Sequence, residues 1–164
     1  MEMVLGNRTI NRRAFLTGAA LLPFLGGAAG AATETLPLIT VFKDASCGCC
    51  GGWIDHVKKA GFPVSVTDTE DMEAVKDRFK VPSQLYSCHT AEVSGFSIEG
   101  HVPVAAIQRL LAERPPIIGL SAPGMPVGSP GMETPGIAPE VYDIIAFDKN
   151  GMKPFARFIG DKAV

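Results

Sequence analysis

Three of the four cysteines in the chain fall within four residues, in the stretch DASCGCCGGW at residues 44–53. This stretch follows a short apolar, β-rich run at residues 36–42, so its thiols are expected in the turn after a buried strand. A disulfide between Cys49 and Cys50 would be strained, because a relaxed disulfide separates its Cα atoms by about 5.5 Å. Cys47 and Cys50 form the comfortable local pair, a C-x-x-C register. The stretch is therefore a redox pair with a third, unpaired thiol, a structural disulfide or a metal site.

The N-terminal residues have the three-part layout of an export signal. Arg12 and Arg13 precede an apolar run at residues 14–25, and small residues at 29–31 offer a cleavage site. The run is too short and too rich in Gly and Ala for a membrane span of about 20 strongly apolar residues, so we expect no membrane span in the mature chain. The arginine pair resembles a twin-arginine (Tat) signal; a general secretory signal and an uncleaved anchor are the alternatives. We expect residues 1–31 to be a signal peptide and the protein to be periplasmic.

Composition sets two further limits. A chain of 164 residues with 46% hydrophobic residues suits one compact domain, which we expect at residues 36–158. The formal net charge of −2 and the lack of a basic, aromatic-rich stretch argue against nucleic-acid binding. An oxidising compartment ordinarily pairs an even number of cysteines as disulfides, but the crowding of three thiols resists complete pairing.

The order of the predicted elements indicates an α/β fold. It is strand, helix, strand, helix, β-hairpin and helix, at residues 36–42, 52–60, 64–66, 70–79, 83–102 and 104–114. The first three elements imply parallel strands joined by a right-handed crossover. This order, with a C-x-x-C pair at a helix start, resembles the thioredoxin fold, a three-layer domain with a mixed sheet. Helix N-termini also lower thiol pKa values and favour thiolate.

The C-terminal part is expected to hold a loop and a hairpin. Residues 119–139 are rich in Gly and Pro and should not continue a helix or a central strand. This loop, which we call the methionine loop, carries Met125 and Met132 on short turns. Residues 142–147 and 152–158 read as a final β-hairpin, because the Asn-Gly pair between them is a strong turn signal.

Soft metal ligands gather at positions expected to be exposed. These candidate ligands are Cys47, Cys49, Cys50, Cys88, His101, Met125 and Met132. Thiolates and thioethers select Cu(I), zinc or iron-sulfur clusters, and methionine favours copper because zinc rarely takes thioether ligands. Neighbouring cysteines do not easily point into one tetrahedral centre, so bridging thiolates in a multinuclear Cu(I) centre fit the crowding better.

Each candidate also has a structural interpretation. Cys88 is an ordinary buried strand cysteine unless the strand lies beside the cysteine loop, which the predicted fold favours. His101 caps backbone groups at a helix entrance or binds metal. His89 alternates with Cys88 and is expected to face the other side of the sheet. Met125 and Met132 pack the loop or act as soft copper ligands.

Four motifs in order, SCGCCGGW, VPSQLYSCHTA, IEGHVP and GLSAPGMPVGSPGM, resemble the exported CopG copper-resistance proteins, which are unrelated to the DNA-binding repressors of that name. The resemblance covers roughly residues 36–158. It implies a thioredoxin-like domain that binds copper through Cys47, Cys49, Cys50 and Cys88, with redox cycling between Cu(I) and Cu(II). It also implies copper efflux or chaperone proteins as partners.

Two function classes compete. The first is a protein of copper resistance and homeostasis that binds several Cu(I) ions, with activity as a copper oxidoreductase left open. The second is a thiol-disulfide oxidoreductase with Cys47 as the attacking thiol and Cys50 as its partner. Cys49 argues against it, because a third thiol would divert the disulfide, as does Ser46 at the place where thioredoxins carry Trp. A copper metallochaperone that hands over its ion through the methionine loop is a further alternative.

Overall fold

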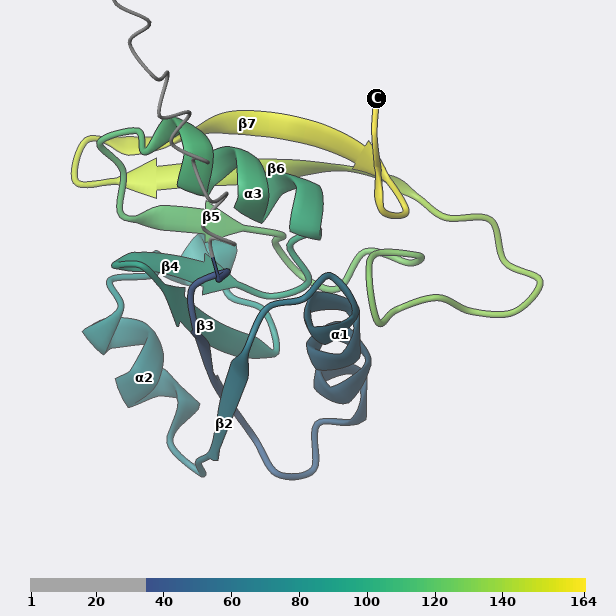
Figure 1. Cartoon of the computed structure of the whole chain (residues 1–164), viewed down its shortest axis with the longest axis horizontal. Coiled ribbons are helices and arrows are strands. Elements are labelled where there is room, and N and C mark those ends of the chain that lie inside the picture. Colours follow the sequence, from purple (N-terminus) through teal and green to yellow (C-terminus); the bar gives the residue numbers. More distant parts are fainter. Residues whose placement is uncertain (1–34) are drawn as a thin grey trace, which may run out of the picture. The chain divides into compact units, whose positions relative to one another are not determined.

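The computed structural model describes residues 35–164, and the expected signal peptide of residues 1–31 lies outside them. The described residues form a mixed α/β fold around one open sheet (Figure 1). In chain order the elements are β1 (Ile39–Lys43), α1 (Gly48–Lys59), β2 (Val64–Asp68), α2 (Met72–Arg78), the 3-10 helix η1 (Ser83–Leu85), β3 (His89–Val93), β4 (Phe96–Glu99), α3 (Val104–Glu113), β5 (Gly119–Ser121), β6 (Val141–Asp148), β7 (Gly151–Ile159) and β8 (Lys162–Ala163).

The eight strands of the sheet are arranged in the order β2-β1-β3-β4-β5-β6-β7-β8. Two pairs are parallel, β1 with β2 and β4 with β5. The remaining neighbours are antiparallel. The predicted α/β class with a mixed sheet is confirmed.

The helices cover both faces of the sheet. On one face, Trp53 of α1 and Leu110 of α3 belong to the same buried apolar core as Ala91 of β3. Residues alternate across a strand, so Thr90 points to the opposite face, where it contacts Lys76 of α2. Thr90 and Ala91 are neighbours in β3, and their side chains therefore point into the layers on opposite faces of the sheet.

The expected loop at residues 119–139 begins too early. Its first three residues form β5, a fully buried strand between β4 and β6. The glycine content that suggested a loop has another cause here, because a Cβ atom on Gly119 would lie only 2.1 Å from the Ser97 carbonyl oxygen. Glycine is thus needed for close backbone approach between two strands, and the loop proper covers residues 122–140.

Other boundaries agree more closely with the predictions. The final hairpin is confirmed as β6 and β7, and β8 adds a short edge strand. The predicted turn at Ser94 and Gly95 joins β3 to β4. In contrast, α1 begins at Gly48, about one turn earlier than expected, which places Cys49 and Cys50 inside the helix.

Candidate metal centre

The cysteine loop is a tight turn that leads into α1. Asp44 holds this turn, because its Oδ1 accepts from the Ser46 backbone N–H at 2.7 Å and its carbonyl oxygen accepts from the Cys47 N–H at 3.0 Å. Cys47 is the N-cap residue of α1, but no side chain caps the helix and its first turn holds no acidic residue. The first N–H groups of a helix lack intrahelical partners and carry partial positive charge. This end of α1 therefore favours a negatively charged group beside it.

Cys47 and Cys50 are joined by a disulfide, with Cα atoms 5.6 Å apart. This is the C-x-x-C pair that the spacing favours. Cys49 and Cys88 are free thiols. In this form two of the four sulfur atoms are covalently paired, so a site built from four thiolates requires reduction of the disulfide by two electrons.

Cys88 comes from a distant part of the chain and completes the cysteine cluster, which we define as Cys47, Cys49, Cys50 and Cys88. Its Sγ atom lies 3.8 Å from Cys49 Sγ, and Cys49 Sγ lies 3.6 Å from Cys47 Sγ. All four sulfur atoms are within 4.8 Å of one another. Cys88 directly precedes β3, which pairs with β1, and the cysteine loop directly follows β1. The sheet register thus brings together thiols 38 to 41 positions apart in sequence.

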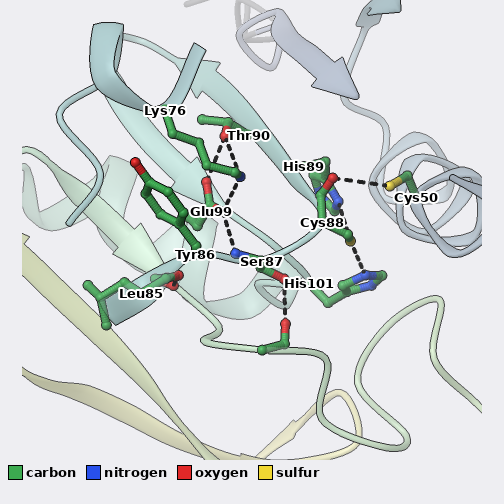
Figure 2. A network of polar contacts seen from close by, with 12 residues as sticks. Cys50, Lys76, Leu85, Tyr86, Ser87, Cys88, His89, Thr90, Glu99 and His101 are labelled. Carbon is green, nitrogen blue, oxygen red and sulfur yellow. Dashed lines mark hydrogen bonds and ion pairs between the residues drawn. The ribbon is translucent and has the colours of Figure 1, made fainter. Parts of the chain in front are cut away.

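Two histidines contact the same Cys88 sulfur atom. His101 Nε2 lies 3.0 Å from Cys88 Sγ, and His89 Nδ1 lies 3.4 Å from it. Figure 2 shows Cys88 and His101 pointing toward one another, with Cys50 on the other side of Cys88. Together Cys88, His89 and His101 form a second group whose ligand atoms lie within 4.8 Å of one another. We call it the histidine group.

The expectation that His89 faces the far side of the sheet from the site is wrong. His89 shares a face of β3 with the core residues Ala91 and Val93. The centroid of its ring lies 4.5 Å from the centroid of the Trp53 ring of α1. Cys88 lies before the first residue of β3, so the alternation of the strand does not apply to it. Both side chains therefore reach the α1 side. The Cys-His pair at residues 88 and 89 carries the sequence signal, but the alternation of side chains along β3 begins only at His89.

Hydrogen bonding determines which nitrogen of His101 can act as a ligand. Its Nδ1–H donates to the Pro130 carbonyl oxygen at 2.8 Å. A ring nitrogen that donates to a carbonyl carries the proton, so in the neutral ring Nε2 holds the lone pair. His89 differs, because its Nε2 is buried and has no hydrogen-bond partner among the described residues.

Burial keeps this part of the site neutral when no metal is bound. Burial and the neighbouring Cys49 raise the pKa of the Cys88 thiol to about 12. Burial also lowers the pKa of His101, and it lowers the pKa of His89 well below its usual value. Neutral imidazoles can bind metal directly, and a bound cation would displace the thiol proton of Cys88.

A buried ion pair supports the site from the opposite face of the sheet. Lys76 Nζ lies 2.5 Å from Glu99 Oε1, and both side chains are almost fully buried. The same carboxylate accepts from the Ser87 backbone N–H at 2.6 Å and from the Thr90 hydroxyl at 2.7 Å (Figure 2). Glu99 therefore anchors the residues on both sides of Cys88 and His89. No sequence pattern predicts this pair, because a Lys and a Glu among other charged residues carry no local signal of burial.

The methionine loop contacts the site through its backbone. Pro130 accepts the bond from His101, and Gly131 lies against the start of α1, where a Cβ atom would be 2.4 Å from the Trp53 backbone N. Met132 follows directly and is half-buried, whereas Met125 is 53% exposed. The fold thus places Met132 next to residues that touch the site and leaves Met125 in solvent.

His56 accepts a hydrogen bond from the Val104 backbone N–H at 3.3 Å, and it belongs to neither ligand group. Within residues 35–164, no helix is both long and apolar enough to cross a membrane.

Comparison with known proteins gives two kinds of match. A family model described as "Protein of unknown function, DUF411" matches residues 85–132, the segment that holds Cys88, both site histidines and the methionine loop up to Met132. Two solved structures, "Copper resistance protein copG- Form 1" and "Copper resistance protein copG- Form 2", are each 42% identical to this chain with a TM-score of 0.71. The match covers 76% of this chain and 99% of the first structure, and 75% and 98% for the second. No curated protein matches the chain.

Proposed function

We propose that this chain, which belongs to the CopG family of copper-resistance proteins, is a periplasmic protein of copper resistance and homeostasis that binds Cu(I) through its cysteine cluster. The observation that carries the proposal is the approach of four sulfur atoms to within 4.8 Å of one another. Soft thiolate ligands select soft cations, Cu(I) foremost among those that a copper-resistance protein meets. The donor set therefore fits Cu(I).

The arrangement of the sulfur atoms favours several ions over one. Cys49 and Cys50 are consecutive residues of α1, so their side chains leave the helix about 100° apart. Cys88 approaches from the residue before β3, and its Sγ atom lies 3.8 Å from Cys49 Sγ. Four thiolates that diverge in this way surround one ion poorly, whereas thiolates that each bridge two ions need not converge on a single point. We infer a multinuclear Cu(I) centre.

Loading of this centre begins with reduction. A dithiol reductant supplies two electrons and two protons to the Cys47–Cys50 disulfide, which yields two thiols and an oxidised reductant. Cu(I) then replaces the thiol protons. His101 adds its Nε2 lone pair beside Cys88, and Met125 and Met132 supply thioethers along the loop by which Cu(I) approaches. A centre built this way could also cycle between Cu(I) and Cu(II).

We also infer that the chain is exported and that its domain has a thioredoxin-like core. The twin arginines Arg12 and Arg13 and the small residues at 29–31 support a Tat-type signal peptide that is removed from the mature domain. The run from β1 to α3 supports a thioredoxin-like core, because its strands pair in the order β2-β1-β3-β4 with β1 and β2 parallel. In this core the cysteine loop lies between β1 and α1, at the helix start.

Copper stoichiometry tests the proposal. The chain is purified without chelator, reduced with a dithiol, freed of reductant and titrated with Cu(I) under anaerobic conditions. We expect more than one Cu(I) per chain for the reduced protein, fewer for the disulfide form, and loss of the multiple binding in Cys49→Ser. Ala45→Ser is the matched control, because it adds the same hydroxyl to an exposed position of the same turn. A reduced wild-type chain that binds one Cu(I) or none would refute the multinuclear centre.

One observation favours the alternative function of thiol-disulfide exchange, namely the formed disulfide between Cys47 and Cys50. The free thiol of Cys49 lies only 3.6 Å from Cys47 Sγ and would compete with Cys50 for any mixed disulfide. The two functions separate in Cys49→Ser. Metal-free Cys49→Ser that reduces a disulfide substrate at the wild-type rate would identify an oxidoreductase, whereas a copper protein would show no such activity.

A further inference from the structure

The histidine group is a candidate site in its own right. Cys88, His89 and His101 meet on the α1 side of the sheet, and both imidazole rings are completely buried. None of the three residues takes part in the Cys47–Cys50 disulfide. All three ligand atoms of this group are therefore available in the oxidised form of the chain, whereas two of the four thiols of the cysteine cluster are not.

The distances suit a single metal ion. A metal about 2.3 Å from sulfur and about 2.0 Å from nitrogen, in tetrahedral geometry, separates the two donor atoms by about 3.5 Å. The observed separations from Cys88 Sγ are 3.4 Å to His89 Nδ1 and 3.0 Å to His101 Nε2. His89 already meets this requirement, and His101 needs to withdraw by about 0.5 Å on the same estimate.

The surroundings of the rings also fit a ligand role. The bond from His101 Nδ1–H to the Pro130 carbonyl oxygen aims the Nε2 lone pair at the sulfur atom, as outer-shell partners of metal-binding histidines do. His89 is fully buried with one nitrogen that has no partner among the described residues, although buried polar atoms are normally satisfied. When Nδ1 of His89, which lies 3.4 Å from Cys88 Sγ, binds an ion, the ring proton is on Nε2.

We propose that Cys88, His89 and His101 bind one divalent transition-metal ion of the Zn²⁺, Co²⁺ or Cu²⁺ class, at a position that shares Cys88 with the cysteine cluster but needs none of its other three thiols. This position is available while Cys47 and Cys50 are disulfide-bonded. One thiolate and two imidazoles are the donors that these borderline ions accept. Binding releases one proton, from Cys88 Sγ, and a water molecule takes the fourth position. The ion enters from the side of Cys88, which is the only half-exposed residue of the three. This inference goes beyond the proposed function, because it requires neither Cys47, Cys49 nor Cys50.

The test isolates the site from the cysteine cluster. In the variant Cys47→Ser/Cys49→Ser/Cys50→Ser, Cys88 is the one remaining cysteine of the chain. We expect this variant to bind one Co²⁺, with a thiolate-to-cobalt charge-transfer band that disappears when Cys88→Ser is added. His89→Gln or His101→Gln in the same background should weaken Co²⁺ binding at least about tenfold, since even outer-shell losses cost that much. His56→Gln is the control and should leave affinity unchanged.

Two results would overturn the proposal. One is a folded triple variant without a charge-transfer band, and the other is equal Co²⁺ affinity in the His89→Gln, His101→Gln and His56→Gln variants. If the triple variant does not fold, the same histidine variants are compared in the otherwise native, disulfide-bonded chain, after two free thiols have been counted. Cu(I) stoichiometry of the reduced wild-type chain is measured separately, so failure of this site and failure of the copper centre are distinguishable.

Discussion

The Nδ1–H of His101 donates to the Pro130 carbonyl oxygen at 2.8 Å, and this bond joins the methionine loop to the candidate metal centre. On its other side the same ring contacts Cys88, which lies 3.8 Å from Cys49. A loop that is remote in sequence from the cysteine loop therefore helps to determine the orientation of a candidate ligand. Gly131, the next residue of the loop, contacts α1 directly.

We predict that Gly131→Ala destabilises the fold and weakens metal binding. Gly131 has a φ of +86°, and an added Cβ would lie 2.4 Å from the Trp53 backbone N, so the loop must move away from α1. Backbone strain of this kind costs about 1–3 kcal/mol. Urea unfolding and Cu(I) affinity would measure both effects. Gly136→Ala is the control, because Gly136 has a similar φ of +80° but its added Cβ would have no neighbour within 4 Å; equal losses in both variants would show that the contact is unimportant.

Glu99→Gln should be strongly destabilising. Removing the carboxylate leaves the Lys76 ammonium buried without its partner, and breaking a buried ion pair costs about 3–5 kcal/mol. Replacing both residues, in Lys76→Met/Glu99→Leu, should cost less than the single change because no buried charge remains. Free energies of unfolding from urea titrations of the three proteins would test this order. A double variant less stable than Glu99→Gln would contradict it.

The metal-free protein should lose stability in mild acid. Burial holds the pKa of His89 well below its usual value, whereas the unfolded chain protonates this residue near pH 6.5. Below that pH the unfolded state binds the additional proton, so the free energy of unfolding decreases as pH falls, by up to about 1.4 kcal/mol per pH unit for this residue. Urea unfolding between pH 8 and pH 5, in steps of about one pH unit, would give the slope of the free energy of unfolding against pH. His89→Gln should reduce the slope, and an unchanged slope would exclude His89 as its source.

Met125→Leu/Met132→Leu should weaken Cu(I) binding or slow Cu(I) transfer, while leaving the free energy of unfolding nearly unchanged. Leucine has a similar volume but no thioether, and Met125 is 53% exposed, so little packing is lost. Competition with a chromogenic Cu(I) chelator gives both affinity and exchange rate. Met152→Leu, a change at a 48% exposed residue of β7, is the matched control. Wild-type affinity and kinetics in the double variant would assign both methionines to loop packing.

Much of the local structure could be predicted. The C-x-x-C register identified Cys47 and Cys50 as the one local pair that can form a disulfide without strain, and this is the pair that is bonded, because Cα spacing across three residues depends on the local turn. The hairpin turn at Asn150 and Gly151 was predicted from turn chemistry in the same way. The β5 strand at residues 119–121 was missed, because its glycine is required by a neighbouring strand and not by its own conformation.

By itself, the sequence determined the positions of the thiols, the α/β class of the fold and the C-terminal hairpin, since spacing, hydrophobic periodicity and turn residues act over a few positions. The tertiary structure alone decided that His89 shares a face with the site, that Lys76 and Glu99 form a buried pair behind it, and that Pro130 orients His101. These contacts join residues 23 to 36 positions apart, which only strand pairing and helix packing bring together. Burial and partner choice at such separations depend on the whole fold, which no local pattern encodes.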